Sequence, residues 1–154
     1  MNGRDLCPGG DRGYVPHTRV VGIDPGPNPG LVVLTIRRRA LSRAATFDLD
    51  QLDDVLRDAD LVSMERFIIG RGTTRRTRGG TDTTLAMIGD ITGRCDRAGV
   101  AVVSFPAGMV KPWASNDRLA AWGITLRGDH HRDAARHALF AAVRAGLLPR
   151  RPGA

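Results

Sequence analysis

Cysteine is scarce in this chain, which limits the kinds of site it can build. The 154 residues contain only Cys7 and Cys95, and these form no C-x-x-C motif. Two cysteines so placed, one of them in a predicted tail, support neither a zinc site nor a disulfide framework. We therefore expect a reducing, cytoplasmic setting.

Long apolar runs are also absent. Nowhere do about 18 apolar residues follow one another, and the first residues have no apolar segment between charged and small ones. Neither a membrane segment nor a secretion signal is expected. Residues 1–18, rich in Gly and Pro, are predicted to be a flexible leader, residues 19–148 one domain, and residues 149–154 a short tail.

Positive charge dominates the composition. The formal net charge is +7, the pI is near 11.0, and all but one of the 23 basic residues are Arg. A surface of this sign attracts phosphates at long range, so nucleic acid is the first candidate partner. GC-rich coding would also enrich Arg, but the clustering of Arg between residues 71 and 78 is local and favours nucleic acid.

Apolar periodicity predicts an α/β sheet that mixes antiparallel and parallel pairing. Strands are expected over 19–24, 31–36 and 40–47, and their short connections favour an antiparallel meander. A short helix (50–59), a strand (61–64), a basic loop (70–80), a helix (83–98) and a strand (100–105) follow. A short helix is also predicted over residues 117–122. A last helix is expected from an N-cap at Asp129 to near Gly146.

Three carboxylates stand at informative places in this pattern. Asp24 ends a buried strand before a Pro/Gly turn, and Glu65, the only glutamate, closes the apolar run 61–64. Asp133 lies in the first turn of the last helix. Three converging carboxylates indicate a divalent metal, although Asp24 alone is also compatible with a turn cap and Glu65 with a buried Arg partner.

The last helix adds imidazoles to this set. His130, Asp133 and His137 follow at i, i+3 and i+7, on one stripe, and His130 with Asp133 is a plausible ligand pair. His137 is expected to be a supporting or core histidine, whereas His131 and Arg136, off the stripe, are expected to contact solvent or phosphate. Oxygen-rich ligation suits Mg²⁺ or Mn²⁺, and two such ions support phosphodiester cleavage.

These residues resemble a known family. Gly22-Ile23-Asp24-Pro25-Gly26, Glu65 after an apolar strand, Val110-Lys111 and His130-x-x-Asp133-Ala134 are similar to the RuvC family of Holliday-junction resolvases, and most closely to versions carried by actinobacterial phages. The likeness covers most of residues 19–146. It implies an RNase H-like fold with three antiparallel strands and then parallel strands, a homodimer, and hydrolysis of branched DNA in a bacterial or phage-infected cytoplasm.

The resemblance also implies roles for single residues. Asp24, Glu65 and Asp133 become metal ligands with His130 in the fourth place, for two Mg²⁺ ions that Mn²⁺ can replace. Lys111, the only lysine, matches a residue near the scissile phosphate; its alternative is an ordinary surface role.

Contacts to DNA are less closely matched. The family often places an aromatic residue three positions beyond the glutamate, whereas here Phe67 lies two beyond and Ile68 occupies the third. The Arg-rich loop is expected to contact the DNA backbone. The predicted DNA-binding residues are Phe67, Arg71, Arg75, Arg76, Arg78 and Lys111.

Other functions stay open at this point. An RNase H-like nuclease for RNA or hybrids would use the same metal site, and a non-catalytic module would keep the fold and bind branched DNA without cutting. The face formed by Met87, Ile88 and Ile91 fits either a dimer interface or the monomer core. An actin-like ATPase would need a second phosphate-binding half, for which 154 residues leave little room.

Overall fold

One five-stranded sheet organises the molecule. The computed structural model describes residues 16–67 and 75–154. The strands stand in the spatial order β3-β2-β1-β4-β5, with β1, β2 and β3 antiparallel and β4 and β5 continuing parallel to β1. Their bounds are β1 (His17–Asp24), β2 (Gly30–Arg37), β3 (Ala40–Phe47), β4 (Leu61–Glu65) and β5 (Ala101–Phe105). The predicted mixed sheet is confirmed.

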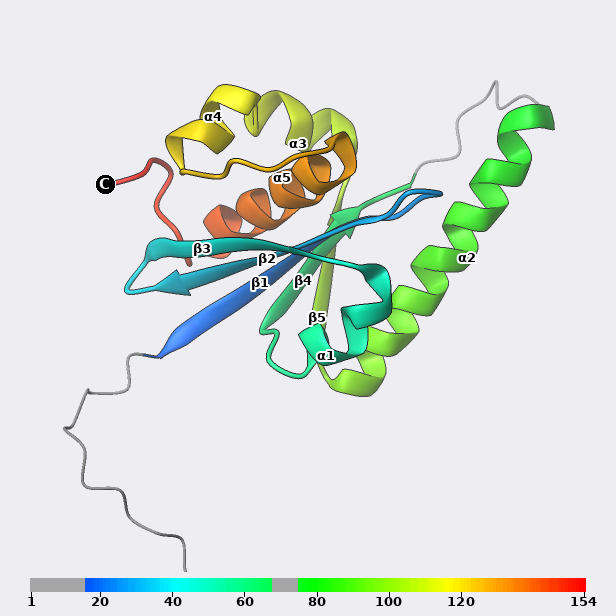
Figure 1. The fold of residues 1–154 in the computed structure, drawn as a ribbon, viewed down its shortest axis with the longest axis horizontal. Coiled ribbons are helices and arrows are strands. Elements are labelled where there is room, and N and C mark those ends of the chain that lie inside the picture. Colours follow the sequence, from blue (N-terminus) through cyan, green and yellow to red (C-terminus); the bar gives the residue numbers. More distant parts are fainter. Residues whose placement is uncertain (1–15, 68–74) are drawn as a thin grey trace, which may run out of the picture.

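Helices cover both faces of this sheet (Figure 1). One face carries α3 (Ala107–Trp113), α4 (Asn116–Ala121) and α5 (Asp129–Arg144). The other carries a 3₁₀ turn, η1 (Leu49–Gln51), with α1 (Leu52–Leu56) and the long α2 (Arg75–Ala98). A tight hairpin joins β2 to β3, whereas α2 makes the long crossover that the parallel pair β4 and β5 requires.

Successive side chains of a strand point to opposite faces of the sheet, and apolar residues here occupy both faces. The molecule therefore has two apolar cores, one on each face. Val20, Val32 and Leu34 pack toward α5, while Val21, Ile23 and Val33 pack toward α1 and α2. On α2, Ile91 and Cys95 are fully buried in the second core, with Met87 and Ile88 partly buried against it. The Met87, Ile88 and Ile91 face therefore belongs largely to the monomer core. No helix in the described ranges is long and apolar enough to cross a membrane.

Three predicted boundaries were wrong. The loop predicted over 70–80 is helical from Arg75 onward, because a helix nucleated by the apolar stripe of 84–95 extends cheaply, one hydrogen bond per added residue. Asp129 is the first residue of α5 and Gly128 is its N-cap, with φ 83°. Strand β1 starts at His17, which pairs with Arg37, two residues before the predicted start at Arg19.

Helix α3 was not predicted at all. Pro106 precedes this segment and Pro112 lies within it, and both discourage a helical assignment from sequence. In the structure Pro106 is the N-cap, where a missing N–H leaves no helical bond unmade, and Pro112 falls in the final turn. The helix has one fully buried residue, Val110, which fixes it against Phe140 of α5.

Candidate active site

The ends of two neighbouring strands bring Asp24 and Glu65 together. β1 and β4 run parallel, and Ile23 pairs with Met64, so the next residue of each strand lies at the same end of the sheet. Asp24 is only 9% exposed, and the Glu65 side chain is mostly buried. Burial is the largest influence on both carboxyls and raises the pKa of each above its ordinary value.

Two glycines let α5 lie directly on this part of the sheet. A Cβ atom at Gly22 would overlap the carbonyl oxygen of Ala134, and one at Gly30 would overlap that of His130. The backbone of the helix thus replaces side chains as the contact. As a result His130 reaches the end of β1, where its Nδ1 lies 2.8 Å from Oδ2 of Asp24.

Helix α3 supplies the cation of the site. The Nζ of Lys111 donates to Oδ2 of Asp133 at 2.9 Å. Burial alone would raise the pKa of Asp133, but the hydrogen bonds from Lys111 and Arg136 outweigh it and lower that pKa. The bond to Asp133 raises the pKa of Lys111 in return. Asp133 is therefore ionised and Lys111 charged at neutral pH.

Arg136 has a different role from the one predicted. Its guanidinium donates to Oδ1 of Asp133, to Oδ1 of Asn116, and through Nε to the carbonyl of Ala114 at 2.9 Å. The side chain is 14% exposed, so the expected solvent or phosphate contact was wrong. The i, i+3 spacing from Asp133 was the available sequence signal, since such residues are neighbours on a helix.

His137 is a buried histidine, as predicted. It is fully buried, and its Nε2 lies 4.0 Å from Oε2 of Glu65. Neither ring nitrogen has a hydrogen-bond partner among the described residues. Burial lowers its pKa to about 4, so a neutral imidazole packs behind the Glu65 carboxylate at neutral pH.

The donor chemistry of the site suits a hard divalent cation, but its present geometry is that of an ion-paired cluster. Within residues 16–67 and 75–154, no three His, Cys, Asp or Glu side chains stand at metal-ligand spacing. The negative charge of Asp133 contributes to the raised pKa of Asp24 and to that of Glu65. The three carboxyl groups are therefore close enough to interact electrostatically. A cation bound there would compete with Lys111 and Arg136 for Asp133.

The predicted DNA-contacting residues are only partly described. Phe67 is 38% exposed and lines a groove of about 370 Å³ together with Leu85 and one of the three carboxylates, Glu65. Arg71 lies outside the described residues. Arg75, Arg76 and Arg78 fall in the first turns of α2, where the backbone alone is described. Their contacts with DNA remain predictions.

One kind of comparison with known proteins, that of solved structures, supports the fold. No protein-family model and no curated protein sequence matches the chain. Among solved structures, T. thermophilus RuvC in complex with Holliday junction substrate matches with a TM-score of 0.57 and 20% identity, over 85% of this chain and 98% of that chain. A match at this identity concerns the fold alone. The chain therefore has the RuvC-like, RNase H-like fold that its motifs predict.

Proposed function

We propose that this protein is a divalent-metal-dependent endonuclease that cuts branched DNA, including Holliday junctions. One observation carries the proposal. Asp24, Glu65 and Asp133, from three separate elements, share one end of the sheet with Lys111. This cluster occurs in a fold that also belongs to a protein solved with a Holliday junction substrate. Carboxylates that can bind divalent metal ions, with a lysine beside them, are suited to phosphodiester hydrolysis.

In this proposal Asp24, Glu65, Asp133 and His130 hold two Mg²⁺ ions, which Mn²⁺ can replace. The metals supply Lewis acidity and lower the pKa of bound water. Side chains of the protein orient the ligands and contact the phosphate. Arg136 holds the Asp133 carboxylate in one orientation between α5 and Asn116.

Lys111 is the cation that would meet the phosphate. Its side chain is 48% exposed, so its ammonium could turn from Asp133 toward a scissile phosphate if Asp133 held a metal ion. A compact charge at this point offsets the negative charge that develops in the transition state. We therefore assign Lys111 a catalytic role.

Substrate contacts follow from charge. The formal net charge of +7 favours a polyanion. We assign backbone contacts near the cut to Arg71, Arg75, Arg76 and Arg78. Phe67, exposed at the groove beside Glu65, is the described aromatic residue best placed to stack on an unpaired base.

We also propose a homodimer, since two sites related by a twofold axis would place one cut on each of two opposing strands. Leu85 of α2 is 38% exposed and, unlike Met87 and Ile88, does not pack into the second core, so its side chain is available to a second copy. Sedimentation of the wild type and of Leu85→Glu tests this: the variant should lose the dimer. The cytoplasmic setting and the likeness to phage versions stay predictions.

The test is a cleavage assay with labelled four-way junction and a linear duplex of the same sequence, with Mg²⁺ or with EDTA. The wild type should nick the junction only when Mg²⁺ is present. Asp24→Asn should abolish nicking, whereas Asp54→Asn, at an exposed carboxylate on α1, should not change it. Equal binding with and without Mg²⁺ and no cut would instead establish a non-catalytic module. Cleavage confined to an RNA–DNA hybrid would establish an RNase H-like nuclease.

A further inference from the structure

The β2–β3 hairpin has an unusual turn. Its two central residues, Arg38 and Arg39, have φ values of 49° and 61°. In the described part of the chain they are the only non-glycine residues with positive φ. A two-residue hairpin loop with both residues left-handed is a type I′ turn, which strongly favours Asn-Gly because other side chains are strained there. Two arginines in this turn are therefore unfavourable for folding.

The same hairpin carries a patch of unpaired charge, which we call the hairpin patch: Arg37, Arg38, Arg39 and Arg43. All four residues are exposed. None has an ion pair or side-chain hydrogen bond with another described residue. By contrast Arg19, in the adjacent strand, is held by Asp58 at 2.8 Å. Several neighbouring positive charges with no acidic partner in the protein indicate a surface that binds an anionic ligand.

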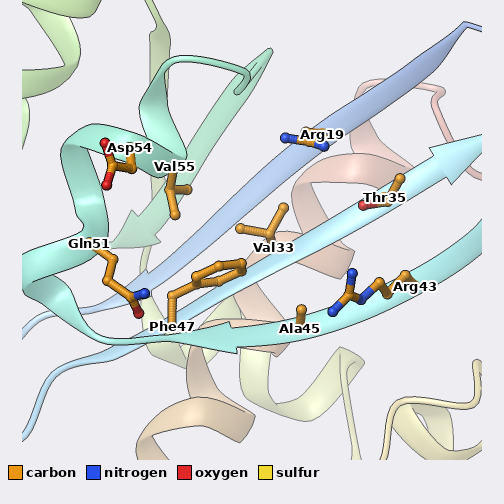
Figure 2. A pocket seen from close by; sticks show the side chains of 9 residues that line it. All are labelled: Arg19, Val33, Thr35, Arg43, Ala45, Phe47, Gln51, Asp54 and Val55. Carbon is orange, nitrogen blue, oxygen red and sulfur yellow. The ribbon is translucent and has the colours of Figure 1, made fainter.

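The sheet extends this charge from the turn onto one face. Arg19 pairs with Thr35, and Thr35 pairs with Arg43, so the three side chains form one row across β1, β2 and β3. Figure 2 shows this row along a cavity of about 180 Å³ whose apolar wall includes Val33, Ala45 and Val55. Arg37 lies on the same face by strand alternation. Because Arg19 is paired with Asp58, the unpaired positive charge reaches from the tip of the hairpin into the sheet as far as Arg43.

The hairpin patch lies at the opposite end of the sheet from the carboxylates. Asp24 pairs with Gly30 at one end of β1, whereas His17 pairs with Arg37 at the other. The eight residues of β1 span about 26 Å at about 3.3 Å per residue. In Figure 1 the hairpin lies near the C-terminal end of the chain, away from the turn that follows β1. This surface is therefore separate from the candidate active site.

We propose that the hairpin patch binds the phosphate backbone of duplex DNA at a second site, remote from the cleavage site. Guanidinium groups match phosphate geometry and bind it through paired hydrogen bonds. The large exposed apolar side chains of the described residues are Phe67, Leu85 and Met109, none of them in the hairpin. The patch accordingly lacks the stacking surface that single strands use and the apolar anchor that membranes require.

Binding of a linear duplex of about 20 base pairs in EDTA tests this without any cutting, so failure of the nuclease proposal would not affect the result. Affinity is measured over a series of salt concentrations. Arg38→Asn with Arg39→Gly should bind more weakly and reduce the slope of log K against log salt by about 2, since each phosphate that is no longer neutralised lowers the slope by about one unit. The same variant should melt higher, by about 2–4 °C, because Asn-Gly fits the turn.

Two further variants keep the test decisive. Arg37→Gln with Arg43→Gln leaves the turn intact and should reduce the slope similarly, even if the turn variant folds poorly. Arg57→Asn with Arg97→Asn removes the same charge from the C-cap of α1 and from α2, and it should leave the slope nearly unchanged. An unchanged slope in both patch variants, or an equal fall in the control, would overturn the proposal.

Discussion

Gly22 of β1 lies against the main-chain carbonyl of Ala134 in α5 with no room for a methyl group between them. This contact sets how closely α5 approaches the sheet. It therefore sets the position of Asp133, one residue before Ala134, relative to Asp24, two residues after Gly22. Backbone-to-backbone packing, more than any side chain, brings the two carboxylates to one end of the sheet.

Gly22→Ala should consequently destabilise the fold. The added Cβ meets backbone, which cannot rotate away, so we expect a loss of about 1–3 kcal/mol, as for other overpacked cores. Urea unfolding measures it. Gly26→Ala is the matched control, because a Cβ at Gly26 has no atom within 4 Å. Equal stability of the two variants would contradict the assigned contact.

Arg136→Lys should be costly although it keeps the charge. A lysine cannot reach Asp133, Asn116 and the Ala114 carbonyl together, so partly buried acceptors lose a donor. We expect a loss of about 1–3 kcal/mol in chemical denaturation. Arg132→Lys, at an exposed pair with Asp129, should cost less than about 0.5 kcal/mol. A larger loss for Arg132→Lys would reverse the ranking and refute this account.

Stability in metal-free buffer should fall below neutral pH because of His137. Its pKa is about 4 in the folded protein and near 6.5 when unfolded, so the unfolded chain binds the extra proton first as pH drops. The free energy of unfolding should decrease from about pH 6.5 downward, by roughly 3 kcal/mol at pH 4 from this group alone. The raised pKa values of Asp24 and Glu65 change the stability in the opposite direction as pH falls.

His137→Gln isolates the contribution of the imidazole. The difference between wild type and variant in the free energy of unfolding should shrink as pH falls from 6.5 to 4.5. Thermal melts at several pH values measure it. A difference that stays constant with pH would show that the imidazole does not titrate in this window.

Lys111→Gln should reduce junction cleavage by about 10²-fold, the cost of losing one preorganised charge in a transition state. Arg118→Gln removes a neighbouring cation that instead packs over the Trp113 ring at 4.2 Å, and it should leave the rate unchanged. Single-turnover cleavage in Mg²⁺ measures both. Junction affinity of Lys111→Gln in EDTA should stay within about twofold, since one contact among many contributes little to binding.

Strand ends were the part of the site most accessible from sequence. Asp24 and Glu65 each close an apolar run, so their place at strand ends followed from the pattern. That their two strands are parallel neighbours, which brings the carboxylates together, was seen only in the structure. Lys111 was singled out by resemblance, but its helix was missed because one proline precedes it and another lies within it. Arg136 was misassigned because its acceptors, Ala114 and Asn116, come from a distant segment whose approach depends on tertiary packing.

Buried side chains are unevenly distributed along α2, and this affects local unfolding of the helix. The helix has 24 residues, about 36 Å of length, and among its described side chains, those of residues 82–98, the fully buried Ile91 and Cys95 lie toward its C-terminal end. Helical turns without buried contacts open at low free-energy cost, independently of global unfolding. The exposed Leu85 and Ala86 come before that buried pair, so their amide hydrogens should exchange with solvent sooner than those around Ile91, while the sheet and α5 stay folded.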